Sequence, residues 1–328
     1  MAERIVRKNF MFKKKLGFLL GVMVALSLAG YLVCLLSGNG KKSNSEENFL
    51  LVTSFYPMYV LAENLTEGVE GITVSNLTEN QTGCLHDYQL TSRDMKLLSQ
   101  ADAFLINGAG MELFMEKVLE NNAGLPVIEA SHGIPLLEGA EHNHAGTGHE
   151  EHEHSHDHAE NGHVWLDVER YRGQLSIVKD ELIKLLPEQK TALETAAAAY
   201  DAKLQTLTAY TEELKKNLEG TPVVIFHEAF AYLAESVGMD VIMALSLDEE
   251  TVPSAGEIAE VIAEIKYHGG AYLLIEQEYA DYADKILAET NASAVYLEPL
   301  TTGDGDRSSY YKEMQKNLDV LSILKGIE

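Results

Sequence analysis

The most unusual feature of this sequence is the placement of its histidines. The chain contains 12 of them, and seven fall within the 17 residues from His142 to His158, interleaved with Glu, Asp, Gly and Ser. Zinc, copper and nickel favour imidazole ligands, and a dense run of imidazoles offers many weak, exchangeable sites. No large apolar side chain is present in the run to hold a fixed geometry, so we expect a loop without regular structure. The alternative is a solvated loop whose histidines have no function, but their density favours a role in metal capture. A rigid metal site is expected elsewhere in the chain.

Three other histidines stand at positions where a fixed site can form. His86 lies in Gly-Cys-Leu-His-Asp-Tyr ahead of a predicted helix, His163 lies two residues before the only tryptophan, and His227 directly follows a predicted strand. Taken singly, each is more often a partly buried structural histidine than a ligand. Taken together, they lie at the ends of elements in both halves of the chain. Three imidazoles with a carboxylate or water give the tetrahedral geometry that suits zinc, whereas manganese favours more oxygen ligands.

The elements that must position these histidines form two α/β halves. Short apolar runs alternate with helical patterns, which implies parallel strands joined by crossover helices. Thr91 and Asp94 have the spacing of a capping box, which places a helix start at Thr91. In the first half we expect strands at residues 49–53, 72–75, 103–106 and 126–128 and helices at 59–65, 91–100 and 111–120. In the second half we expect strands at 223–226, 241–245, 272–275 and 294–297 and helices at 228–237, 254–267, 281–290 and 308–324.

A long helical segment separates the two halves. Leu193, Tyr200, Leu207 and Leu214 recur every seven residues, which predicts one helix over residues 188–218, about 45 Å long. The expected fold class is α/β, with two Rossmann-like lobes joined by this helix. The metal site is expected in the cleft between the lobes, at the carboxyl ends of the strands. The expected organisation is a signal or membrane anchor with its tether at 1–42, an N-terminal lobe at 43–187 with a His-rich loop at 139–162, a linking helix at 188–220 and a C-terminal lobe at 221–328.

The first 42 residues differ from the rest of the chain. They carry eight of the 25 basic residues, and three lysines at 13–15 precede 21 uncharged residues from Leu16 to Leu36. This order is typical of an export signal or membrane anchor. We therefore expect an extracytoplasmic protein anchored to the bacterial cell membrane. Cys34 suggests a lipoprotein, although the Tyr-Leu-Val before it matches the processing signal poorly, and an uncleaved helix is the alternative.

The remainder of the chain is strongly acidic. It holds 17 basic and 50 acidic residues, and a surface of this kind attracts cations and disfavours nucleic acid as a partner. Only two cysteines exist, Cys34 and Cys84. Because the first falls in the expected membrane segment, the folded part has no pair for a disulfide or a cysteine-type zinc ribbon.

Five passages between Phe49 and the C-terminus stand in a distinctive order. They are Leu85-His86-Asp87-Tyr88-Gln89-Leu90-Thr91 with the stretch 102–111, the His-rich loop, His163-Val164-Trp165-Leu166, Phe226-His227-Glu228-Ala229-Phe230 with Tyr232 and Leu233, and Leu297-Glu298-Pro299-Leu300. In this order and spacing they resemble the metal-binding solute-binding proteins of ABC transporters, in the ZnuA-like branch called cluster A-I. The resemblance implies a receptor that is not an enzyme and that hands Zn²⁺, its transported ligand, to an ABC transporter permease. We expect it to act as a monomer.

The resemblance also implies a ligand set. The family's three zinc-binding histidines fall on His86, His163 and His227, and its members differ at the fourth ligand, which is a second-lobe carboxylate or a water. Where several relatives place an acidic ligand, this chain has Thr301. Glu276 is the first expected substitute, either as a ligand or as a carboxylate that orients a histidine. Two further carboxylates stand behind it: Glu298 and Asp304.

Three other functions stay open at this point. A manganese-binding receptor and a surface adhesin have the same fold as the resembled family. A zinc hydrolase also uses three ligands and an activated water, and Glu228 next to His227 offers a carboxylate. The chain contains no His-Glu-x-x-His helix, Gly-x-Ser-x-Gly elbow or P-loop, which argues against the hydrolase.

Overall fold

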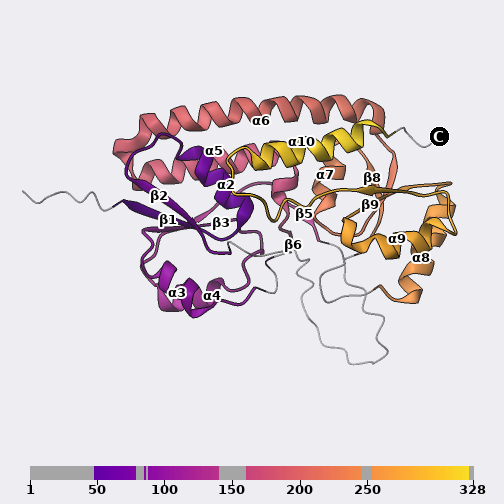
Figure 1. Ribbon diagram of the computed structural model, residues 1–328, viewed down its shortest axis with the longest axis horizontal. Helices are drawn as coiled ribbons and strands as arrows, with labels where there is room; N and C mark the ends of the chain where they lie inside the picture. Colours follow the sequence, from indigo (N-terminus) through magenta and orange to yellow (C-terminus); the bar gives the residue numbers. More distant parts are fainter. Residues whose placement is uncertain (1–47, 79–84, 86–87, 140–159, 246–252, 325–328) are drawn as a thin grey trace, which may run out of the picture. The chain divides into compact units, whose positions relative to one another are not determined.

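Two parallel four-stranded sheets carry the candidate site (Figure 1). The structure is a computed structural model and describes residues 48–78, 85, 88–139, 160–245 and 253–324. The first sheet, ordered β2-β1-β3-β4, consists of β1 (Phe49–Thr53), β2 (Ile72–Asn76), β3 (Ala103–Ile106) and β4 (Val127–Glu129). The second sheet, ordered β10-β9-β7-β8, consists of β7 (Pro222–Ile225), β8 (Asp240–Ala244), β9 (Tyr272–Ile275) and β10 (Ser293–Tyr296). In both sheets the second strand lies on one side of the first, and the third and fourth lie on the other side.

The central strands are apolar at consecutive positions because both faces of each sheet are covered. Side chains alternate between the faces of a strand. In β3, Leu105 joins a large core cluster, whereas Phe104 and Ile106 join a smaller cluster on the other face. In β9, Leu274 joins the large cluster, whereas Leu273 and Ile275 join another small one. This near-continuous apolar pattern is the one expected of buried parallel strands, and it confirms the predicted α/β class.

Helices connect the strands and cover the sheets. Around the first sheet lie α2 (Tyr56–Leu65), α3 (Ser92–Leu98) and α4 (Met115–Asn121). Around the second lie α7 (Phe230–Ser236), α8 (Ala255–Tyr267), α9 (Ala280–Leu287) and α10 (Ser309–Ser322). The predicted capping box at Thr91 is confirmed, because its hydroxyl accepts a hydrogen bond from the Asp94 N–H and the Asp94 carboxylate accepts one from the Thr91 N–H.

The predicted long helix is α6 (Lys190–Leu218), and it begins two residues later than expected. It follows α5 (Val168–Leu185) and a short turn at Pro187–Gln189. Helix α6 packs against α5, α2 and α10 (Figure 1). Its buried leucines join the large core cluster, which also contains side chains of both sheets. One continuous core therefore lies beneath both lobes.

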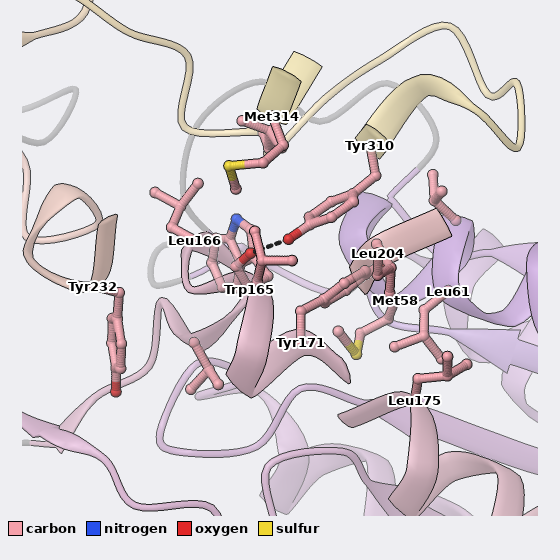
Figure 2. Packing of buried hydrophobic residues seen from close by; sticks show 14 of the residues in the cluster. Met58, Leu61, Trp165, Leu166, Tyr171, Leu175, Leu204, Tyr232, Tyr310 and Met314 are labelled. Carbon is pink, nitrogen blue, oxygen red and sulfur yellow. Dashed lines mark hydrogen bonds between the residues drawn. The ribbon is translucent and has the colours of Figure 1, made fainter. Parts of the chain in front are cut away.

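Buried aromatic residues connect the parts of this core (Figure 2). The rings of Tyr171 and Tyr310 stack with centroids 3.9 Å apart. The Tyr310 hydroxyl donates to the carbonyl of Trp165 at 2.7 Å, and the Trp165 indole N–H donates to the carbonyl of Pro299 at 2.9 Å. These bonds satisfy polar groups that would otherwise be costly to bury. They join α10 and the loop after β10 to the segment that carries His163.

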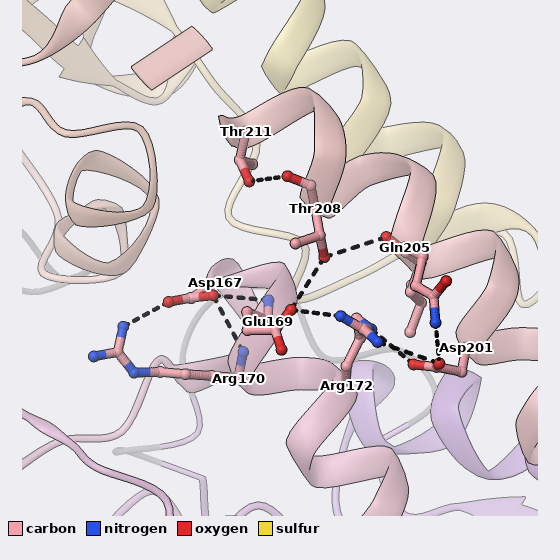
Figure 3. Close-up of polar contacts among 9 residues, drawn as sticks. Asp167, Glu169, Arg170, Arg172, Asp201, Gln205, Thr208 and Thr211 are labelled. Atoms are coloured by element: carbon pink, nitrogen blue, oxygen red, sulfur yellow. Dashed lines mark hydrogen bonds and ion pairs between the residues drawn. The ribbon is translucent and has the colours of Figure 1, made fainter. Parts of the chain in front are cut away.

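Helix α5 begins directly after Asp167, which caps it. The carboxylate of Asp167 accepts from the backbone N–H groups of Glu169 and Arg170 (Figure 3). Farther along α5, Arg172 binds Asp201 of α6 at 2.7 Å (Figure 3). The cap fixes the first turn of α5 only four residues after His163, and the ion pair helps to hold α5 against α6.

Two features were not predicted. A two-residue antiparallel ladder joins β5 (Leu137–Glu138), directly before the expected His-rich loop, to β6 (Glu160–Asn161), near the end of that loop. Helix α4 begins at Met115 and not at residue 111. The reason is that Glu112 turns its carboxylate into the protein, where it accepts hydrogen bonds from the backbone N–H groups of Asn107 and Gly108.

Several predictions lie outside the described residues. These are the membrane segment at 16–36 with Cys34, Cys84, His86, and the histidine run at 142–158. In the part of the chain that is described, no helix combines the length and the apolar character that a membrane crossing requires. The described residues from Asn48 onward form one compact unit.

Candidate metal centre

A histidine and a carboxylate meet at the carboxyl end of the second sheet. Strands β7 and β9 are parallel neighbours, and His227 follows β7 by two residues whereas Glu276 directly follows β9. In this sheet the strand order reverses between β7 and β9, and such a reversal point is the usual ligand position in an open α/β sheet. His227 Nδ1 lies 2.6 Å from Glu276 Oε1, and the side chains are 14% and 15% exposed. With the carboxylate oxygen as acceptor, Nδ1 carries a hydrogen, and in the neutral imidazole Nε2 then carries the lone pair.

His163 is held by a buried asparagine. The histidine is 2% exposed and precedes the short turn Val164–Leu166, whose residues are all buried. Its backbone N–H donates to Asn161 Oδ1 at 3.0 Å, and its Nδ1 lies 2.9 Å from the same oxygen. Its ring packs beside Trp165 with centroids 5.2 Å apart. The backbone, one ring nitrogen and one side of the ring are thus all held in place.

The two histidines contact each other. Their ring centroids are 4.9 Å apart, and their planes meet at 82°. His163 comes from the segment between β6 and α5, and His227 comes from the end of β7. Two imidazoles from distant parts of the sequence therefore converge at one place, and each presents its Nδ1 to an oxygen atom.

The equivalent position in the first sheet holds a buried carboxyl group. Glu112 is 6% exposed and accepts hydrogen bonds from the Ser54 hydroxyl at 2.7 Å and from the Asn107 N–H at 2.8 Å. Ser54 and Asn107 directly follow β1 and β3. Burial raises the pKa of Glu112 to about 7, against the opposing effect of these hydrogen bonds. Asn107 also donates to the carbonyl of Gly162 at 2.9 Å, which connects this network to the residue before His163.

Of the four predicted ligands, the structure places His227 in contact with His163 on one side and with Glu276 on the other. His86 lies outside the described residues, next to Leu85, which is fully buried in the large core cluster. Within the described ranges, no three His, Cys, Asp or Glu side chains form a group that can hold a metal ion. A complete centre needs a further ligand, and His86 is the one that the sequence predicts.

The two reserve carboxylates have other surroundings. Glu298 and Asp304 are both exposed. The backbone of Glu298 exchanges two hydrogen bonds with the side chain of Asn317. The Asp304 carboxylate accepts from the N–H of Asp306 at 2.9 Å.

Sequence reasoning did not identify Asn161, Asn107 or Glu112. The pair Asn161-Gly162 is a turn signal directly before His163, and it is the only local hint of a special backbone there. A side chain at residue 162 would meet the carbonyl oxygen of Ala109, because an added Cβ atom would lie only 2.9 Å from it. Glycine is therefore needed for the close approach of these two segments.

Comparisons with known proteins show which family and which structures the chain resembles. A family model described as zinc-uptake complex component A, periplasmic, matches residues 51–323. The zinc-binding lipoprotein AdcA of Streptococcus pneumoniae (strain ATCC BAA-255 / R6) is 29% identical over 319 residues, which cover 94% of this chain and 60% of AdcA. The high-affinity zinc uptake system protein ZnuA of Bacillus subtilis (strain 168) is 29% identical over 301 residues, which cover 87% of this chain and 90% of ZnuA. The chain thus spans about three fifths of the length of AdcA.

Solved structures have the same fold. Zn(II)-bound AdcA from Streptococcus pneumoniae superposes with a TM-score of 0.68 at 27% identity, covering 85% of this chain and 59% of that one. The solute-binding protein FpvC from Pseudomonas aeruginosa in complex with Mn²⁺ superposes with a TM-score of 0.70 at 23% identity, covering 84% and 97%. The second likeness shows the fold alone. Because the family model matches most of the chain, this protein belongs to the ZnuA family, whose members are metal-binding solute-binding proteins of transport systems and not enzymes.

Proposed function

We propose that this protein is an extracytoplasmic zinc receptor that delivers Zn²⁺ to an ABC permease for high-affinity uptake. The observation that supports this most directly is the contact between His163 and His227, with centroids 4.9 Å apart. A histidine that binds a metal through one nitrogen usually donates the other N–H to an oxygen atom, which fixes its orientation. Both histidines have this arrangement at Nδ1.

The proposed ligands are the Nε2 atoms of His163 and His227, with His86 as the third histidine. Neutral imidazole is a good zinc ligand, and three of them leave one tetrahedral position for a water or a carboxylate. The contact between Glu276 and His227 Nδ1 supports the orienting role for this carboxylate more than the role of direct ligand. We therefore place water in the fourth position.

Zinc is the proposed metal because the donor set is rich in nitrogen. Manganese prefers more oxygen ligands than this site offers, whereas zinc is commonly bound by three histidines. AdcA and ZnuA are named as zinc proteins, which supports the same choice. A manganese receptor is the second candidate. The comparisons give no support to a role in attachment.

Other features of the sequence are consistent with a metal receptor anchored at a membrane. The histidine run and the acidic surface of the exported part would raise the local concentration of divalent cations. The basic and apolar N-terminal segment would anchor the protein at the membrane. The permease is the partner that the family relationship suggests.

The test is a zinc titration of the full chain against a chromophoric chelator. We expect one tight zinc site per chain, with higher affinity than the weaker sites of the histidine run. His86→Ala, His163→Ala and His227→Ala should each weaken the tight site by more than the roughly 10–100-fold that follows loss of an outer partner of a ligand. His268→Ala is the matched control, because His268 forms a surface pair with Glu264 at 3.2 Å. Unchanged tight binding in the three variants would refute the ligand set.

A growth experiment separates uptake from the other roles. Cells without the protein should grow poorly in zinc-depleted medium and recover when zinc is added. Recovery with manganese in place of zinc would favour the manganese receptor. Normal growth in depleted medium would contradict a role in uptake.

A further inference from the structure

We propose that Asn161 is the positioning residue of the metal centre, because its amide selects the metal-binding nitrogen of His163 and ties His163 to the backbone beside His227. This inference rests on the proposed zinc site. Asn161 is 2% exposed and is the last residue of β6, two positions before His163. A buried amide is stable only when its donor and acceptor atoms are paired.

The surroundings of Asn161 allow only one orientation of its amide. The Oδ1 and Nδ2 atoms of asparagine are nearly equal in size, so the orientation of the amide is assigned from its hydrogen-bond partners. The carbonyl oxygen of Glu228, 2.9 Å away, can only accept, and it therefore faces Nδ2. The backbone N–H of His163 can only donate, and it therefore faces Oδ1. Both requirements agree.

This orientation determines the tautomer of His163. Oδ1 of Asn161 is an acceptor, and His163 Nδ1 lies 2.9 Å from it. The imidazole must therefore carry a hydrogen on Nδ1, and in its neutral form the lone pair is then on Nε2. His227 reaches the same tautomer through Glu276. Both histidines thus share the neutral tautomer that binds a metal ion through Nε2.

Asn161 also connects two segments that are far apart in the sequence. Glu228, which accepts the Nδ2–H, directly follows His227. The carbonyl of Asn161 accepts from the Tyr232 hydroxyl of α7 at 2.6 Å. The same hydroxyl accepts from the N–H of Leu137 in β5 at 3.0 Å. Asn161 therefore links the segment that carries His163 to the residue after His227 and, through Tyr232, connects the β5–β6 ladder to α7.

The decisive experiment compares two substitutions of Asn161 in the full chain. Asn161→Leu keeps the size of the side chain and removes both polar groups, so zinc affinity should fall about 10–100-fold. Asn161→Asp keeps an oxygen acceptor for His163 and loses only the donor to Glu228, so its affinity should fall less than that of Asn161→Leu. Asn317→Leu is the matched control, because Asn317 is also 2% exposed and bonds a backbone N–H and a backbone carbonyl.

A spectroscopic measurement distinguishes positioning from general stability. The visible spectrum of the first equivalent of Co²⁺ reports the geometry at the tight site. It should change in Asn161→Leu and stay as in the unsubstituted protein in Asn161→Asp and Asn317→Leu. Zinc affinity of Asn161→Leu within threefold of the unsubstituted protein would overturn the proposal, and so would an equal loss in Asn317→Leu.

Two further outcomes are also informative. If Asn161→Leu does not fold, Asn161→Asp decides alone, because a changed cobalt spectrum there would overturn the tautomer assignment. If the unsubstituted protein has no tight zinc site, the proposed function fails. A tight zinc site whose affinity is unchanged by substitution of Asn161 refutes only the positioning role, so the two failures can be distinguished.

Discussion

Substitution of Glu276 tests whether this carboxylate orients His227 or binds the ion. Its Oε1 atom lies 2.6 Å from His227 Nδ1 in a largely buried pair. In Glu276→Gln the amide oxygen can still accept from Nδ1–H, whereas in Glu276→Ala the acceptor is lost. The two variants therefore separate the hydrogen bond from the negative charge.

The expected magnitudes follow from the type of bond. A hydrogen bond to a charged group contributes about 1.5–3 kcal/mol, which corresponds to roughly 10–100-fold in an equilibrium constant. In the orienting role, Glu276→Ala should weaken zinc binding by about this factor. Glu276→Gln should lose less than about tenfold, because a neutral bond retains part of the energy. In the ligand role, both variants lose a zinc-bound oxygen anion and should weaken binding by similar, larger factors.

The assay is the same competition titration with the full chain, and the surface provides a matched control. Glu264 Oε1 lies 3.2 Å from His268 Nε2 in an exposed pair, so Glu264→Gln and Glu264→Ala repeat the chemistry away from the site. These controls should bind zinc as tightly as the unsubstituted protein. Equal and severe losses in Glu276→Gln and Glu276→Ala would refute the orienting role and return Glu276 to the ligand set.

Two further predictions concern regions beside the site. Because burial raises the pKa of Glu112 to about 7 from its ordinary 4.5, the folded state binds a proton that the unfolded chain has released. The free energy of unfolding should therefore fall by about 3 kcal/mol between these pH values. Urea unfolding of Glu112→Gln should lack this fall, and parallel pH profiles of the two proteins would contradict the reasoning. Replacement of residues 140–159 by a short Gly-Ser linker, with Glu138 and Glu160 retained, should leave one tight zinc site in calorimetry. Loss of that site would place it in the replaced segment.

The elements of the fold were predictable where the local pattern is strong. Strands such as β3 and β9 are apolar on both faces, and the heptad spacing of Leu193, Tyr200 and Leu207 extends through most of α6. The capping box at Thr91 depends only on residues three apart. In these cases, local chemistry and burial favour the same conformation.

The elements that were missed depend on distant partners. The ladder between β5 and β6 consists of Leu-Glu and Glu-Asn, which have no alternating apolar pattern. Helix α4 is shortened where the Glu112 carboxylate accepts from the Ser54 hydroxyl at the end of β1, besides the nearby N–H groups of Asn107 and Gly108. Neither the strand pairing nor the bond to Ser54 can be identified from neighbouring residues, since both exist only after the chain has folded.

The candidate site was likewise predictable only in part. His227 and Glu276 each follow a strand, so a position at the edge of the second sheet was predictable for both. Their contact was not predictable, because it depends on β7 and β9 being neighbours in the sheet. The role of Asn161 was not predictable, because its partners Glu228 and Tyr232 belong to a separate part of the sequence.

The β5–β6 ladder has a consequence for how this protein can vary. Its two strands are antiparallel and hold residues 138 and 160 opposite each other, so the chain leaves and returns at one point. An insert between such fixed ends adds only a slowly growing entropy term, about 0.6 kcal/mol for each doubling of its length. Gain or loss of histidines by duplication or deletion in this insert would therefore leave the fold and the pair His163 and His227 undisturbed.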